Sequence, residues 1–262
     1  MAKVCQLFSG SSGNAIYIEN AGHSILVDIG VSAKRCEGAL RQIGVDPASI
    51  RAVVVTHEHV DHVRGLRVFC SRYGTNVYAP SKCLQYLEAH GQLSVQFDAR
   101  PSDLPFDDGC FHFTPFRLSH DSADCFGYRI DLQNGTGVAV CTDTGYVPDE
   151  ARTAIAGSDL VFLESNHEVD MLKSGPYPYY LKQRILSDRG HLSNGDSAAF
   201  AAELVGSGTT RVVLAHLSRE NNMPELARSA AFASFEKIGA HSGSDYRLYV
   251  SAPENTERPI VL

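Results

Sequence analysis

The heptapeptide THEHVDH, residues 56–62, contains three histidines and two acids in seven consecutive positions. It follows the apolar run RAVVV at residues 51–55, which is typical of a strand that is buried on both faces. Polar side chains at the end of a buried strand are costly unless they find partners. Neutral imidazole and carboxylate are the usual ligands of zinc and of harder divalent cations. The heptapeptide therefore predicts a metal site at the end of a strand.

Six segments share one pattern, in which an apolar run ends in a side chain of the kind that binds metals. They are LVDIG with Asp28, VVVTHEHVDH with His57, His59, Asp61 and His62, FRLSHD with His120, AVCTDTG with Asp143, FLESNH with His167, and VLAHLS with His216. Strands that end together place the loops that follow them along one edge of a sandwich. We therefore expect these side chains to converge, as a metal site requires.

The spacing within the heptapeptide distributes its side chains between two cations. In an extended segment, residues two apart point to the same side, so His57 and His59 can bind one cation. Asp61 lies where the chain turns into a helix and, with His62, can face a second cation. We expect the ligands His57, His59 and His120 at the first site, Asp61, His62 and His216 at the second, and Asp143 between them.

The order of the expected elements favours an α/β sandwich. Many strands are mixed with helices along the whole length, which predicts two sheets face to face with helices on the outer faces. A doubly wound parallel sheet is the alternative, and strand-only runs at both ends of the first half of the chain weaken it. Helices are expected near residues 61–72, 81–91, 194–206 and 224–237. No repeat or linker is recognised, so we expect one domain over residues 1–262.

The H-x-H-x-D-H pattern, followed by an isolated His, an isolated Asp and a final His, resembles the metallo-β-lactamase fold superfamily over essentially the whole chain. That resemblance implies a four-layer αββα sandwich with its site along one edge. Asp143 stands where many β-lactamases have a cysteine ligand, and such an oxygen-rich site suits phosphoester chemistry. His59 stands where flavodiiron oxygen reductases have Glu, which argues against a redox role. Only 72 residues separate Asp143 from His216, too few for the large insertion of the β-CASP nucleases.

Residues 173–189 carry four cations against one acid, a local charge of +3 in a chain whose net charge is −7. Tyr177, Tyr179 and Tyr180 lie among these cations. Such a mixture suits single-stranded nucleic acid, because bases stack on the rings while the cations neutralise phosphates. An amphipathic helix with a solvated basic face explains the composition equally well. The negative net charge argues mildly against nucleic acid, but bound divalent cations make the site itself positive.

Four segments, SGSSGN, ESNH, GPYPYYLKQRILSDRGHLSN and LAHLSRENN, together resemble the YycJ/WalJ-like branch of the superfamily. This resemblance implies a 5′-3′ DNA exonuclease. The segment GHLSN also resembles the His-Ser-Thr motif of the tRNA 3′-processing ribonuclease tRNase Z, which implies that His191 lies beside the metals.

The reaction expected is two-metal phosphodiester hydrolysis by an activated water, with two divalent ions, Zn²⁺ or Mn²⁺, as cofactors. Asp61, Asp143 and His191 are the expected catalytic residues, and His191, if protonated, donates to the departing oxygen.

The residues expected to contact substrate are Ser11, Ser12, Asn14, His167, Tyr177, Tyr179, Tyr180, Lys182, Arg184, Ser193, Asn194, Ser218 and Asn221. Ordinary structural roles remain open for several of them. The SGSSGN segment also fits a hairpin turn, and His167 also fits a hydrogen bond within its own loop. Asp28 is expected to orient a ligand or to cap its strand.

Two other functions fit parts of the pattern. A thioester or ester hydrolase similar to hydroxyacylglutathione hydrolase shares the H-x-H-x-D-H core but does not need the tyrosine and cation segment. The other alternative, which is not an enzyme, is a metal-stabilised binding protein without turnover. No signal peptide or membrane-spanning run is recognised, and seven scattered cysteines indicate reduced thiols. We therefore expect a cytoplasmic protein with no membrane partner that acts on single-stranded DNA or DNA ends, in an oligomeric state that the sequence does not determine.

Overall fold

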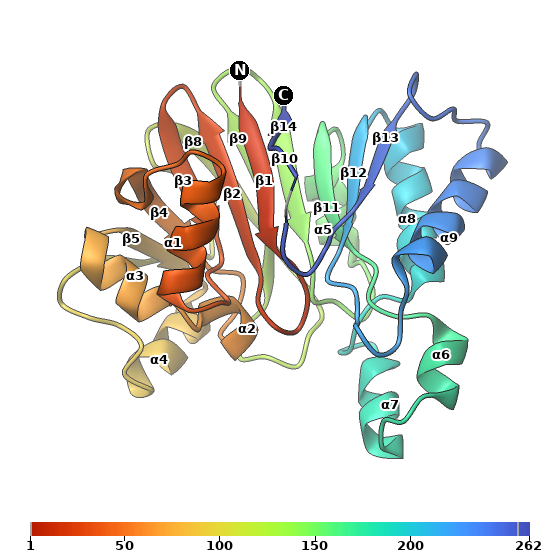
Figure 1. The fold of residues 1–262 in the computed structure, drawn as a ribbon, viewed down its shortest axis with the longest axis horizontal. Helices are drawn as coiled ribbons and strands as arrows, with labels where there is room; N and C mark the ends of the chain where they lie inside the picture. Colours follow the sequence, from red (N-terminus) through yellow and green to blue (C-terminus); the bar gives the residue numbers. More distant parts are fainter. Residues whose placement is uncertain (1, 256) are drawn as a thin grey trace.

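Two β-sheets that mix parallel and antiparallel strands lie face to face in the computed structural model, which describes residues 2–255 and 257–262 (Figure 1). The first has the order β14-β1-β2-β3-β4-β5-β6, with bounds Ile260–Val261, Lys3–Phe8, Ala15–Asn20, His23–Val27, Ile50–Val54, Asn76–Ala79 and Ala99–Pro101. The second has the order β13-β12-β11-β10-β9-β8-β7, with bounds Arg247–Val250, Arg211–Ala215, Leu160–Glu164, Gly137–Cys141, Phe126–Leu132, Phe111–Arg117 and Phe106–Asp107.

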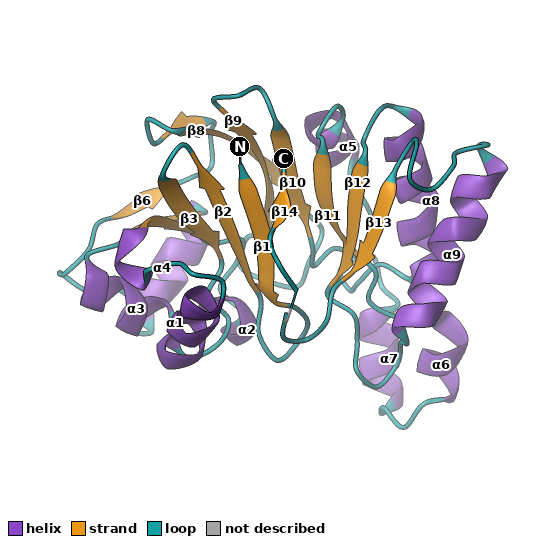
Figure 2. Ribbon diagram, turned by 45° about the horizontal axis from the view of Figure 1, so that its top comes forward, coloured by secondary structure: helices purple, strands orange, loops and turns teal. Residues whose placement is uncertain are grey.

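Helices cover the outer face of each sheet (Figure 2). On the first sheet these are α1 (Ala33–Gln42), α3 (Leu66–Tyr73) and α4 (Ser81–Ala89), and on the second α5 (Asp149–Ile155), α8 (Asn194–Gly206) and α9 (Pro224–Lys237). Three further short helices, α2 (Val60–Val63), α6 (Val169–Ser174) and α7 (Tyr179–Ile185), lie at one end of the sandwich. The expected αββα sandwich is thereby confirmed.

Three clusters of buried apolar side chains hold the four layers together. One lies between the two sheets, and each of the others lies between a sheet and its helices. In β1, Val4 belongs to the central cluster while its neighbour Cys5 belongs to the cluster under the helices. Successive residues of a strand point to opposite faces, so a strand covered on both sides must be apolar throughout. This requirement explains the solid apolar runs in the sequence.

The strands that carry the site residues run in the same direction within each sheet. β3 pairs with β4 in parallel, and β10, β11 and β12 are parallel neighbours. β8 and β10 both pair with β9 in antiparallel fashion, so they also share a direction. The loops that follow these strands therefore lie along one edge of the sandwich, between α2 and α7 (Figure 1).

One local expectation was wrong, and one helix was not foreseen. The helix expected across residues 61–72 is divided into α2 and α3, because the chain at Gly65 packs against the segment that follows β3. A Cβ at Gly65 would lie 2.3 Å from the carbonyl oxygen of Val31. The helix α5, which follows Asp143 in the chain, was not expected.

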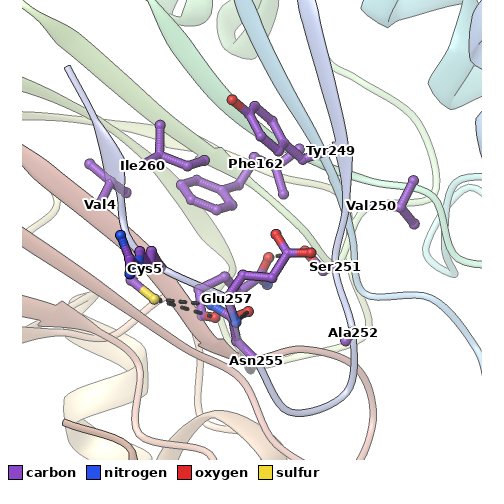
Figure 3. Close-up of a pocket in the computed structure, with 13 residues that line it drawn as sticks. Val4, Cys5, Phe162, Tyr249, Val250, Ser251, Ala252, Asn255, Glu257 and Ile260 are labelled. Atoms are coloured by element: carbon purple, nitrogen blue, oxygen red, sulfur yellow. Dashed lines mark hydrogen bonds between the residues drawn. The ribbon is translucent and has the colours of Figure 1, made fainter. Parts of the chain in front are cut away.

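The C-terminal segment ties the two sheets together. Ser251 N–H donates to Leu214 O (2.8 Å) in the second sheet, and Asn255 N–H donates to Leu7 O (3.0 Å) in the first. Beneath this segment lies a cavity of about 100 Å³, lined by Cys5 and other residues (Figure 3). In the described part of the chain, the helices are all too short or too polar to span a bilayer.

Candidate metal centre

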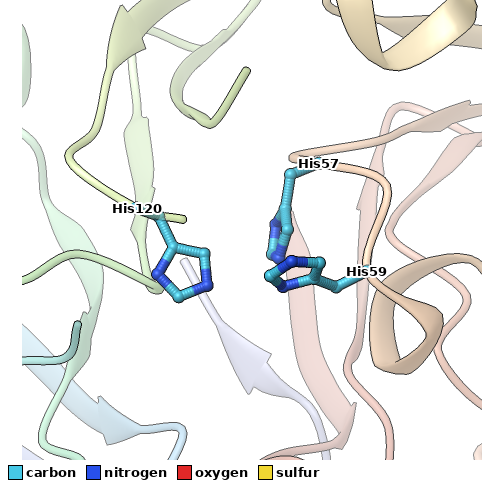
Figure 4. A group of neighbouring side chains, drawn as sticks. All are labelled: His57, His59 and His120. Carbon is cyan, nitrogen blue, oxygen red and sulfur yellow. The ribbon is translucent and has the colours of Figure 1, made fainter. Parts of the chain in front are cut away.

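Three imidazoles meet where β4 and β8 end. His57 and His59 extend from the loop after β4, and His120 faces them from the loop after β8 (Figure 4). Their ligand nitrogens lie within 4.8 Å of one another. The ring centroids of His57 and His120 are 5.2 Å apart, and those of His59 and His120 are 5.1 Å apart. The structure thus brings together the three residues expected at the first site.

A second group lies beside the first, with one carboxylate between them. Asp61, His62 and His216 also have ligand atoms within 4.8 Å of one another. Asp143 Oδ2 lies 3.3 Å from His62 Nε2, and Asp143 Oδ1 lies 3.4 Å from His216 Nε2. The same Oδ1 atom is 3.9 Å from His120 Nε2. Asp143 therefore touches both groups, which is the position expected of a bridging ligand.

Buried atoms without partners show that the residues fit divalent cations. Among the described residues, His57 Nε2 and His216 Nε2 are buried and make no hydrogen bond. Asp143 Oδ2 is also buried and makes no hydrogen bond of good geometry, although it lies close to His62. Buried polar atoms of this kind are costly unless something compensates them. One divalent cation at each of the two groups would satisfy these atoms.

The protein holds the Nδ1 atoms of four of the imidazoles. The Nδ1 atoms of the rings pair with Asp28 Oδ2 for His62 (2.8 Å), Gly190 O for His120 (3.1 Å), Glu164 Oε1 for His216 (2.9 Å) and Thr56 Oγ1 for His57 (3.1 Å). Carbonyl and carboxylate oxygens only accept, so His62, His120 and His216 donate from Nδ1. The Nε2 atoms of His120 and His216 are left for a metal, as in many protein metal sites, whereas His62 Nε2 lies 3.0 Å from the side-chain amide nitrogen of Asn14.

Asp28 orients the loop after β4 through hydrogen bonds that do not involve the Nε2 atom of His62. Its carboxylate accepts hydrogen bonds from the Thr56 N–H (2.8 Å), the Thr56 hydroxyl (2.9 Å) and His62 Nδ1 (2.8 Å). Gly30, two residues later, allows the loop to approach, since a Cβ there would lie 1.6 Å from Asp61 O. Of the two roles open to Asp28, the contacts favour the orientation of His62.

Glu164 is the important residue that the sequence analysis missed. It is fully buried at the end of β11 and accepts hydrogen bonds from His191 Nδ1 (2.8 Å) and His216 Nδ1 (2.9 Å). Burial alone would raise its pKa, but His191 and the other donors lower that pKa to about 2. The signal was a charged residue ending an otherwise apolar strand in FLESNH, where we selected His167 instead.

Asp143, Glu164, His191 and His216 also have ligand atoms within 4.8 Å of one another. Glu164 Oε1 is already paired with the Nδ1 atoms of His191 and His216, and Oε2 accepts from the Thr144 N–H (3.0 Å). We therefore interpret this group as a hydrogen-bond network rather than as a further metal site.

Three residues of the centre have strained backbones. Asp28, Asp143 and His216 have φ values of 63°, 66° and 56°, in the left-handed region that non-glycine residues avoid. Asp28 and His216 come directly after buried strands, and Asp143 lies two residues after the end of one. Such strain persists only where the surroundings impose it, and it is concentrated at functional sites.

The charges of the centre are shifted by burial and by one another. Burial disfavours the charged form of His216, but Asp143 and other nearby carboxylates outweigh burial and raise its pKa to about 10. Burial also opposes the charge on Asp143, yet His216 and His62 hold the pKa of that carboxyl well below its usual range. Burial lowers the pKa of His57 well below its ordinary value. Cations therefore bind here in competition with protons.

A cavity of about 230 Å³ opens onto the centre. Of the residues expected to contact substrate, Ser11, Tyr177, Arg184 and Ser218 line it, together with His191. Tyr179 and Tyr180 do not line it and are 77% and 74% exposed. Lys182 Nζ donates to Lys173 O on the surface. The tyrosine and cation segment therefore contributes some residues to the cavity and presents others to solvent.

The remaining expected contacts lie outside the lining of the cavity. Ser12 Oγ accepts from Arg219 (3.0 Å), and the buried Asn14 side chain lies against Asp61 and His62. Ser193 caps α8, and Asn194 bonds Ser165 and Asn222 inside the protein. The ring of His167 is buried and has no hydrogen-bond partner among the described residues, while burial lowers its pKa. Asn221 is also buried. None of these six lines the cavity.

An αββα sandwich with imidazole and carboxylate ligands along one edge defines a protein of the metallo-β-lactamase fold. Residues 23–217 match the family described as "Beta-lactamase superfamily domain". The chain is 35% identical over 252 residues to exodeoxyribonuclease WalJ of Streptococcus pneumoniae, covering 95% of this chain and 93% of that protein. It is 36% identical over 251 residues to exodeoxyribonuclease YycJ of Bacillus anthracis, covering 95% and 94%.

A crystal structure of the metallo-β-lactamase fold protein YhfI from Bacillus subtilis is similar in fold, with a TM-score of 0.73 and 18% identity over 97% of this chain and 98% of that one. The chain belongs to the β-lactamase superfamily and, within it, to the family of the WalJ and YycJ proteins.

Proposed function

We propose that this protein is a metal-dependent phosphodiester hydrolase that degrades DNA as a 5′-3′ exonuclease, with two divalent cations, Zn²⁺ or Mn²⁺, as cofactors. The observation that carries the proposal is the pair of ligand groups that share Asp143. The similarity to proteins named exodeoxyribonucleases supports DNA as the substrate. The direction of degradation rests on the family resemblance alone.

The protein would hold one cation with His57, His59 and His120 and the other with Asp61, His62 and His216, and Asp143 would contribute to both. When bound, such cations activate water and neutralise the charge that develops on a phosphate. The chain itself fixes four of these rings, all but that of His59, through their Nδ1 atoms.

His191 is the candidate proton donor. Glu164 accepts from its Nδ1 atom at 2.8 Å, which fixes the ring and leaves Nε2 for the cavity that His191 lines. A proton on Nε2 can pass to the departing oxygen once the substrate lies in that cavity. Arg184 is available for phosphate, although it also pairs with Asp121. Tyr177 offers a ring on which a base can stack.

The test is cleavage of a single-stranded oligonucleotide by protein loaded with Mn²⁺ or Zn²⁺. With a label at the 3′ end, we expect a ladder of shortening products, and with a label at the 5′ end, small labelled products from the start. A chelator and the Asp143→Asn variant should both abolish cleavage, and loss in the variant excludes a contaminating nuclease. His191→Ala should retain its metals and lose most of its turnover.

An acyl-glutathione thioester assayed in parallel separates the alternatives. Hydrolysis of the thioester without cleavage of DNA would replace the proposal by the thioester-hydrolase function. Bound metals without turnover of either substrate would favour a binding protein. The named relatives do not favour the thioester alternative.

A further inference from the structure

A second groove opens on the other side of His59 from the cavity described above. It lies between α2 and α4, and its volume of about 530 Å³ falls within the range of small-molecule sites. His59 lines both this groove and the cavity at the metal centre. Figures 1 and 2 place α2 and α4 on one side of the site edge and α6 and α7 on the other. The two hollows thus meet at His59.

An aromatic pair forms part of the wall of this groove. The rings of Tyr86 and His90 are stacked, with centroids 3.9 Å apart and an interplanar angle of 20°. His90 Nδ1 donates to the carbonyl oxygen of Tyr86 at 2.8 Å, which fixes the histidine ring at the end of α4. Tyr86 is nevertheless 42% exposed. A held ring with an accessible surface is the kind of platform on which nucleic-acid bases stack.

The groove also has an apolar side chain next to the metal centre and a cationic side chain in its wall. Val60 follows the ligand His59 directly, and its side chain is 60% exposed. Arg64 also lines the groove and forms no salt bridge within residues 2–255 and 257–262. Glu58 is the one carboxylate among the described lining residues, and its Oε1 atom accepts from the Ala123 N–H at 2.6 Å. The apolar side chain and the aromatic ring suit a nucleic-acid base, and the guanidinium without a salt bridge suits a backbone phosphate.

We propose that this α2–α4 groove, defined by Val60, Arg64, Tyr86 and His90, binds the part of a DNA single strand that lies across the scissile bond from α7. The proposal rests on the nuclease function proposed above. The stacked pair holds a base, and Arg64 contacts a backbone phosphate. Substrates long enough to cross the metal centre therefore gain affinity from the groove, whereas small phosphodiesters do not reach it.

The test compares two substrates in metal-loaded enzyme: a single-stranded oligonucleotide and the chromogenic diester bis(p-nitrophenyl) phosphate. Tyr86→Ala and Val60→Ser should each raise KM for the oligonucleotide, by about tenfold in the case of Tyr86, as expected for the loss of one stacked base. Both should leave kcat/KM for the chromogenic diester unchanged. Arg64→Gln should reduce the salt dependence of oligonucleotide binding. Phe232→Ala, on the exposed surface of α9, is the matched control and should change neither substrate.

The outcomes separate this proposal from the proposed function. If the wild-type enzyme degrades DNA and the groove variants keep the wild-type KM, the groove proposal is overturned while the nuclease function stands. If the wild-type enzyme hydrolyses only the chromogenic diester or a thioester, the nuclease function fails and the groove proposal fails with it. Photocrosslinking of an iodouracil oligonucleotide to the intact enzyme gives a measurement that needs no variant. A crosslink at Tyr86 supports the proposal, and crosslinks confined to the α7 side contradict it.

Discussion

Asp28 and Glu164 hold the metal centre from opposite sides. Each is a buried carboxylate that accepts a hydrogen bond from the Nδ1 atom of a ligand histidine, Asp28 from His62 and Glu164 from His216. Partners of this kind fix the tautomer and the direction of a ligand ring. Because Glu164 also holds His191, it connects metal binding to the candidate proton donor.

Replacement of Glu164 by Gln tests this connection. Glu164 Oε1 faces two imidazole donors, and Oε2 faces the N–H groups of Thr144 and Leu192. An amide has one oxygen, so its NH₂ group must face two donors whichever way it is turned. We expect a 10- to 100-fold loss of metal affinity or of kcat, as is roughly typical for such partners.

The measurement is metal content at equilibrium, together with kcat and KM on an oligonucleotide. Glu203→Gln, on the surface of α8, is the control and should behave like the wild type. A Glu164→Gln protein with wild-type metal affinity and kcat would show that Glu164 only supports the fold.

The convergence of the expected metal ligands could be predicted from the sequence because their spacing is local and their pattern is repeated at strand ends. Glu164 could not, since its function depends on two imidazoles from other segments. His167 shows the converse: its residue type attracted attention, yet its ring is buried and does not line the cavity. Residue type identifies candidates, and tertiary contacts decide which of them are used.

At the scale of elements, the strand ends create the site and the short helices shape its approach. The strands were predictable because burial on both faces requires apolar runs. The division between α2 and α3 was not, because it depends on the approach of Gly65 to Val31. The segment 173–189 was recognised by its composition, but α6 and α7 turn only some of its residues toward the cavity.

A pair of tyrosines from this segment tests the orientation of α7. Tyr177 lines the cavity, whereas Tyr179 is 77% exposed and does not. Loss of a stacked base costs about 1–3 kcal/mol, so Tyr177→Ala should raise KM for an oligonucleotide roughly tenfold. Tyr179→Ala removes the same atoms and should leave KM nearly unchanged. Equal effects of the two substitutions would mean that the DNA follows the exposed face of α7 instead.

For the whole molecule, the metal centre is a connection between the two sheets. The candidate ligands that follow β4 come from the first sheet, and the candidates His120, Asp143 and His216 follow strands of the second. The C-terminal segment makes a second connection through Ser251 and Asn255. Bound cations would therefore stabilise the sandwich as well as serve catalysis, because unfolding separates their ligands.

Removal of the metals should consequently lower the thermal stability of the whole protein. A ligand present at 100 to 1,000 times its Kd stabilises the folded state by about 2.7–4.1 kcal/mol, and 1 kcal/mol corresponds to about 2–4 °C in a chain of this size. We expect Tm to fall by roughly 10 °C on chelation, measured by calorimetry with metal content determined in parallel. Hydrogen exchange should then increase in the loops after β4, β8, β10 and β12 together, because the cations join both sheets. A Tm that does not change once the metals are gone, or exchange that increases in one sheet only, would contradict this connection.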